Sequence, residues 1–214
     1  QKVGNLGDAA CFSFQALKNL TTGEGGMITT NNKEMYDKLK KLRWMGIDKD
    51  TFTRDKEGSY SWMYQVEELG YKNHMNDIQA TIGRVQLKKL DNNLNKKRYD
   101  IAQYYNNRLG KLNWIKTPPE YSNVERVFCL YVIQLEERNR LSEYLSDLGI
   151  STGVHYLPNH HHPFYIKLIE SEYIKLPDVP ITDTLWRKIL DLPLFPDLTE
   201  KELDYICTAI ENFR

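Results

Sequence analysis

The sequence has no long apolar run and no excess of charge of either sign. Its 29 lysine and arginine residues are matched by 29 aspartate and glutamate residues, so charge gives no reason to expect a nucleic acid or an anionic membrane as partner. No apolar stretch approaches the ~20 residues that a membrane-spanning helix needs. Hydrophobic residues make up 41% of the 214, which argues against disorder. We therefore expect a globular protein that binds neither nucleic acid nor membrane.

Cysteine is also scarce. Cys11, Cys129 and Cys207 are far apart in the sequence, and each is set among apolar neighbours. An odd number of cysteines at such spacings favours neither a disulfide framework nor a zinc site. We expect three buried thiols in a reducing compartment, and hence a cytoplasmic protein.

The first four residues, QKVG, include no initiator methionine and no apolar signal stretch. They do not resemble the start of a domain. We therefore expect the chain to begin within one.

Hydrophobic patterns predict alternating strands and helices. In the first third, short apolar segments predict strands at 9–14, which we expect to be buried, and at 26–30. Apolar residues then recur with helical spacing over 33–45, and a long polar stretch at 48–64 predicts a loop.

The remaining two thirds begin with a long helix from Asn76 or Asp77 to about Leu109, with a bend. Thr199 and Glu202 have the spacing of a capping box at the start of the last helix. The alternation predicts a small α/β sandwich, with strands at 127–135 and 150–156 and helices at 138–148, 182–190 and 199–213.

The segment richest in residues that could bind a cofactor or take part in catalysis is SFQALKNLTTGEGG, residues 13–26. Lys18 follows the first strand, with Ser13 before it and a glycine-rich turn after it. A lysine amine attacks an aldehyde only when it can be neutral, and a serine hydroxyl can bind a phosphate oxygen. Glycines let the backbone approach a flat cofactor closely. From the pattern alone, a surface lysine beside a hairpin turn is equally compatible.

The sequence of this segment resembles the cofactor-lysine region of the DegT/DnrJ/EryC1/StrS aminotransferases, which aminate keto groups on nucleotide-linked sugars. Further stretches resemble the same family in the same order, so the resemblance covers essentially the whole chain. They are GYKNHMNDIQA at 70–80, GISTGVHY at 149–156 and LPLFPDLT at 192–199.

The resemblance implies a fold-type-I α/β transferase with pyridoxal 5′-phosphate (PLP) as cofactor. Lys18 would bind the cofactor and act as general base, and Ser13 would hold the phosphate. Relatives often present an asparagine to the neighbouring subunit's phosphate; here Asn73 and His74 are both candidates, and Lys72 could pair with phosphate as a point charge. The resemblance also implies a homodimer with shared active sites.

Histidines gather in the second half of the sequence. In the resemblance, His155, Tyr156 and His160 border the sugar pocket. His161 and His162 extend the run, but the side chains of adjacent residues diverge and no carboxylate stands in register with them. We therefore expect no metal site.

The resemblance assigns residues 1–80 to the end of the large PLP-binding domain, and 81–214 to the linking helix and small C-terminal domain. It places the aspartate that pairs with the pyridine nitrogen upstream of Gln1. By analogy with the family, we expect the parent enzyme to be a sugar aminotransferase with glutamate as its amino donor. We expect the isolated chain to be inactive. Alternatives are a non-catalytic dimerisation or binding module and a PLP-dependent sugar dehydratase, which Lys18 disfavours because such relatives carry histidine there.

Overall fold

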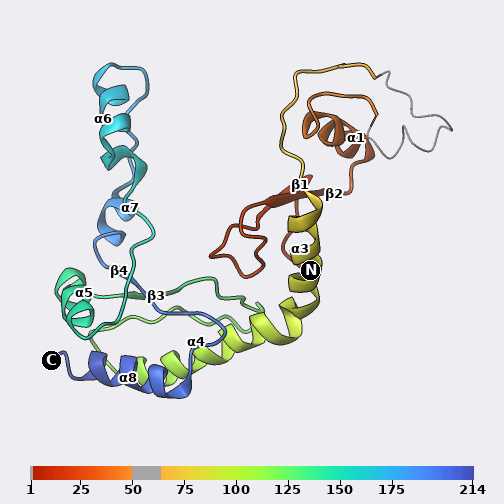
Figure 1. Ribbon diagram of the computed structural model, residues 1–214. Helices are drawn as coiled ribbons and strands as arrows, with labels where there is room; N and C mark the ends of the chain where they lie inside the picture. Colours follow the sequence, from red (N-terminus) through yellow and green to blue (C-terminus); the bar gives the residue numbers. More distant parts are fainter. Residues whose placement is uncertain (1, 50–63) are drawn as a thin grey trace. The chain divides into compact units, whose positions relative to one another are not determined.

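The computed structural model describes residues 2–49 and 64–214, so most of the predicted loop at 48–64 lies outside the described residues (Figure 1). The chain divides into two compact units, Gln1–Leu90 and Asp91–Arg214. No helix of the described ranges is both long and apolar enough to cross a membrane.

The first unit is built on an antiparallel strand pair, β1 (Ala9–Ser13) and β2 (Gly26–Thr30). Ser13 pairs with Gly26, so the lysine segment is the connection between the two strands. Both strands were predicted, but the expected burial of the first is wrong: four of its five residues are exposed. Because the sheet has only two strands, few side chains of this chain are available to cover them.

Helix α1 (Lys33–Leu42) follows directly, and its start is capped by Asn32, whose side chain accepts a hydrogen bond from the Met35 amide at 3.0 Å. A polar side chain just before the first turn satisfies an amide that the helix itself leaves without a partner. The predicted helix is confirmed, ending three residues earlier than expected.

The long helix is also confirmed. It consists of α3 (Asp77–Lys89), a π-helical segment η1 (Leu90–Asn95) and α4 (Lys96–Leu109). The π-helical segment is the local irregularity that a helix of this length accommodates. It spans the point at which the chain divides into its two units.

The second unit contains an antiparallel strand pair, β3 (Tyr131–Gln134) and β4 (Ile189–Leu192). The helices are α5 (Arg138–Asp147), η2 (Asn159–His161), α6 (Pro163–Glu170), α7 (Pro180–Leu185) and α8 (Glu200–Glu211). Helices α4 and α8 lie side by side (Figure 1). The core is apolar, with fully buried side chains that include Tyr105, Tyr131, Leu141 and Ile210.

Two expectations for this unit are wrong. A helix was expected at 182–190, but α7 ends at Leu185 and Ile189 begins β4. The apolar residues Leu185 and Ile189 have helical spacing, yet pairing with β3 decides the conformation. A strand was expected at 150–156, where only Gly153 forms a bridge, to Asp191.

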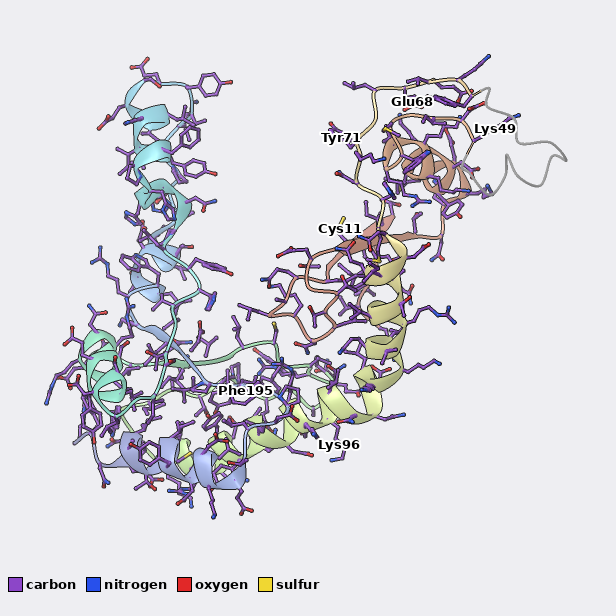
Figure 2. All side chains as sticks on the ribbon, viewed as in Figure 1. Cys11, Lys49, Glu68, Tyr71, Lys96 and Phe195 are labelled. Atoms are coloured by element: carbon purple, nitrogen blue, oxygen red, sulfur yellow. The ribbon has the colours of Figure 1, made fainter. Side chains whose placement is uncertain are left out.

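The cysteine expectation is right for one residue of three. Cys207 is buried, Cys129 is half-buried and Cys11 is exposed. Figure 2 shows Cys11 on β1, the strand whose expected burial is wrong. Burial raises the pKa of the Cys207 thiol to about 12, so it remains protonated and inert.

Candidate active site

Lys18 lies on a loop whose two ends are held together at Phe14. The Phe14 amide donates a hydrogen bond to the Gly25 carbonyl, and the Phe14 carbonyl accepts one from the Thr22 amide, both at 2.9 Å. A turn then forms as the Lys18 amide donates to the Gln15 carbonyl at 2.9 Å. Lys18 is half-buried. The loop therefore fixes the backbone on which the lysine stands.

The glycine-rich turn after the lysine depends on Gly25, which has no side chain. Gly25 has a φ of +147°, and a Cβ there would lie 2.6 Å from Thr22 Oγ1. The Thr22 hydroxyl is occupied, since it donates to the Glu24 carbonyl at 2.7 Å. Any larger residue at position 25 would displace this buried threonine.

The same turn packs against the start of α3. Gln79 Nε2 donates to the Glu24 carbonyl at 2.8 Å, and a Cβ on Gly25 would meet the Met75 side chain at 3.1 Å. Two of the segments that resemble the family, 13–26 and 70–80, thus form one local structure. The Glu24 side chain is exposed; its carbonyl, rather than its carboxylate, makes these contacts.

Ser13 lies at the end of β1 with an exposed side chain. Its oxygen accepts a hydrogen bond from the Gln15 amide at 3.3 Å, which leaves the hydroxyl hydrogen available for another acceptor. The hydroxyl of Thr21, in contrast, donates to the Phe14 carbonyl at 3.3 Å. Gln15, to which no catalytic role is assigned, accepts from the Leu17 amide at 2.9 Å.

Asn73 and His74 follow a segment that packs closely against residues 44–47. The Asn73 amide donates to the Arg43 carbonyl at 3.0 Å, and its side chain is exposed. His74 is half-buried, with its ring edge-on to Trp44 at a centroid distance of 4.2 Å. Lys72 lies over the same indole ring at 4.5 Å. Tyr71, on the same segment, is labelled in Figure 2.

In the second unit, His155 is held by a buried carboxylate. His155 Nδ1 donates to Oδ2 of Asp191, which is 5% exposed and lies on β4. Its other oxygen, Oδ1, is buried with no hydrogen-bond partner among the described residues. Burial raises the pKa of the Asp191 carboxyl, and the hydrogen bond from His155 opposes that rise. Asp191 was not among the predicted site residues, because it is 36 residues from its partner and no spacing rule connects the two.

Tyr156 is exposed, with its ring edge-on to that of His155 at 4.6 Å between centroids. His160 is placed differently: its Nε2 donates to Asp183 Oδ1 at 2.7 Å. His161 Nε2 donates to the same oxygen at 2.8 Å. The expectation that these adjacent histidines diverge, with no carboxylate in register, is therefore wrong. On the short helix η2, both rings reach one aspartate of α7.

The chain thus combines a lysine loop, with a hydroxyl at its entrance, and an α/β second unit. The sequence model of the DegT/DnrJ/EryC1/StrS aminotransferase family matches residues 1–211, and the chain belongs to this family.

Known proteins of the family resemble the chain over nearly its whole length. It is 38% identical to the uncharacterised protein MJ1066 of Methanocaldococcus jannaschii, over 99% of this chain and 55% of that protein. It is 36% identical to the spore coat polysaccharide biosynthesis protein SpsC of Bacillus subtilis, over 98% of this chain and 54% of SpsC.

A solved structure has the same fold as the chain. The putative sugar aminotransferase Spr1654 of Streptococcus pneumoniae in its PMP form superposes with a TM-score of 0.87 at 29% identity, covering 100% of this chain and 54% of Spr1654. The fold expected from the sequence, a partial α/β fold of this family, is confirmed. The chain spans about half the length of the relatives it matches.

Proposed function

We propose that this chain supplies the lysine-bearing part of the active site of a PLP-dependent aminotransferase that acts on a nucleotide-linked keto sugar, with glutamate as amino donor. The observation that carries the proposal is the position of Lys18. It stands half-buried on a loop that is closed at both ends and supported by α3, in a chain of the aminotransferase family.

The described residues fit the cofactor in two respects. Three of the four residues 23–26 are glycines, whose backbone a flat ring can approach closely. The Ser13 hydroxyl has an uncommitted hydrogen to donate to a phosphate oxygen. When bound, PLP supplies the electron sink that stabilises negative charge on the reacting carbon.

Each candidate site residue of the first unit then has a proposed role. Lys18 Nζ would hold the cofactor, and the same amine would take and return a proton at the reacting carbon. Ser13 anchors the phosphate end. Because Asn73 is exposed whereas His74 packs on Trp44, we assign the contact with a second copy's phosphate to Asn73, with His74 supporting the segment. A homodimer with shared sites is part of the proposal.

His155, Tyr156 and His160 are proposed to face the sugar. Asp191 fixes the tautomer of His155: with the hydrogen on Nδ1, the Nε2 atom is the acceptor that a sugar hydroxyl would meet. His160 Nε2 already donates to Asp183, so a contact with the sugar would involve its Nδ1 atom. We further propose that residues 1–80 end the large domain and residues 81–214 form the linking helix and small domain.

The test uses the absorbance of the cofactor bound to a lysine amine, at ~410–430 nm. We expect the 214-residue chain alone to give a weak band and no turnover, because the carboxylate partner of the pyridine nitrogen is proposed to come from residues other than these. Lys18→Ala should abolish the band. Lys38→Ala, at an exposed lysine of the same unit, is the matched control and should leave it unchanged.

Retention of the full band in Lys18→Ala would refute the assignment of the lysine. A strong band with turnover in the wild-type chain would show instead that the chain is sufficient by itself. No band in any form of the chain would favour the non-catalytic module.

A further inference from the structure

A cluster of two imidazoles and a carboxylate lies in the second unit, outside the contacts of the lysine loop. It joins η2 and α7 and consists of His160, His161 and Asp183. One ligand atom from each residue lies within 4.8 Å of the other two. Among the described residues, this is the group of histidine, cysteine and acidic side chains with that geometry.

We propose that His160, His161 and Asp183 form a binding site for a first-row divalent cation, with Zn²⁺ as its best representative. Two imidazole nitrogens and one carboxylate oxygen are the donors that such ions accept, whereas Mg²⁺ and Ca²⁺ prefer oxygen alone. Three protein ligands leave a coordination position open to water or to a ligand. The site does not depend on the proposed function.

The present contacts are close to those a cation requires. The Nε2 atoms of His160 and His161 lie 2.7 and 2.8 Å from Asp183 Oδ1. Ligands at about 2.0–2.1 Å from a tetrahedral zinc are about 3.3 Å apart, so the cluster must open by about half an ångström. The hydrogen that each imidazole now donates must also move from Nε2 to Nδ1, so that the Nε2 lone pair can face the ion.

The surroundings permit this opening. The Asp183 and His161 side chains are 40% and 35% exposed, which leaves them room to move, while His160, at 11%, is the fixed member.

A simpler reading is that Asp183 only links η2 to α7 through hydrogen bonds. The two readings differ in what they predict for added metal. The experiment is a titration of the chelator-treated 214-residue chain with Zn²⁺ in competition with a chromophoric chelator. We expect one ion per chain.

His161→Gln and Asp183→Asn should each weaken binding at least about tenfold, because removing even an outer partner of a metal ligand costs about 10–100-fold in affinity. The matched control is His162→Gln, which removes the adjacent histidine outside the cluster and should leave the affinity unchanged. Circular dichroism in the presence of chelator checks that each variant is folded.

A second measurement needs no variant: Co²⁺ added to the wild-type chain should give the intense visible bands of a four-coordinate site, and Zn²⁺ should displace them. The proposal is overturned if no ion binds at a 1:1 ratio, if Asp183→Asn binds as tightly as the wild type, or if His162→Gln weakens binding as much as His161→Gln. A Co²⁺ spectrum typical of the hexa-aquo ion would also overturn it.

Discussion

The side chain of Tyr105 anchors the segment that follows β4, and its removal gives a quantitative test of the fold. Tyr105 is completely buried, its hydroxyl donates to the Pro193 carbonyl at 2.9 Å, and its ring packs on Tyr131 at 4.8 Å between centroids. Tyr105→Phe retains the ring and removes only the donor. Because Tyr105 is fully buried, water cannot easily take the place of its hydroxyl at the half-buried Pro193 carbonyl, and we expect a loss of about 1–3 kcal/mol.

The matched control is Tyr205→Phe. The Tyr205 hydroxyl also donates to a backbone carbonyl, that of Leu148, at 3.0 Å, but this tyrosine is 51% exposed. Water can replace the lost donor there, so we expect a loss of less than about 0.5 kcal/mol. The two substitutions are chemically identical and differ in burial alone.

Urea denaturation followed by far-UV circular dichroism measures both losses. Equal slopes for the wild type and the variants would show that stability, rather than the denatured state, has changed. For a chain of this size, the Tyr105→Phe loss corresponds to a fall in Tm of about 2–4 °C for each kcal/mol. Equal losses for the two variants would refute the reasoning that burial sets the value of this hydrogen bond.

Two further predictions concern α8. Thr199→Ala removes a capping box in which Thr199 and Glu202 satisfy each other's backbone amides, and should cost about 1 kcal/mol in the same denaturation assay; no measurable loss would contradict the capping role. Glu211 accepts two hydrogen bonds from Arg108, and this partner is the main cause of the lowered pKa of the Glu211 carboxyl. The ion pair therefore stabilises the folded chain above the unfolded-state pKa of Glu211, and this stabilisation is lost as the pH falls through the folded-state pKa. Glu211→Gln should therefore be less stable than the wild type at pH 7, with a difference that shrinks below about pH 4.5; a constant difference across thermal melts at pH 3–7 would rule out the ion pair as its source.

Local signals in the sequence predicted those elements that local interactions specify. The strand at 26–30 and the capping box at Thr199 were both correct, because a few neighbouring residues determine them. Pro163 at the first turn of α6 was also a local signal, of the kind that begins a helix, and it was missed. The family itself was recognisable from segments spread along the whole chain, and the comparison confirms it.

Contacts between distant residues were not predictable in the same way. Ile189 and Leu190 fall at the end of the predicted helix 182–190, but pairing with β3 makes them the start of a strand. Asp183 lies 22 and 23 residues from the two histidines that it accepts from, so no spacing rule connects them. Asp191 lies on β4 and contacts His155. Because the hydrophobic pattern did not predict that strand, it did not predict this contact either.

The closed loop at Phe14 makes the position of the Lys18 amine independent of the register of β1 and β2. Strand pairing ends at Ser13 and Gly26, and the backbone bonds of Phe14 close the loop immediately beyond them. Substitutions within residues 15–21 can therefore alter where the lysine amine reaches while the register of β1 and β2 stays the same. The position of this amine can thus change by single substitutions within the loop, while the strand pairing that carries the loop is kept.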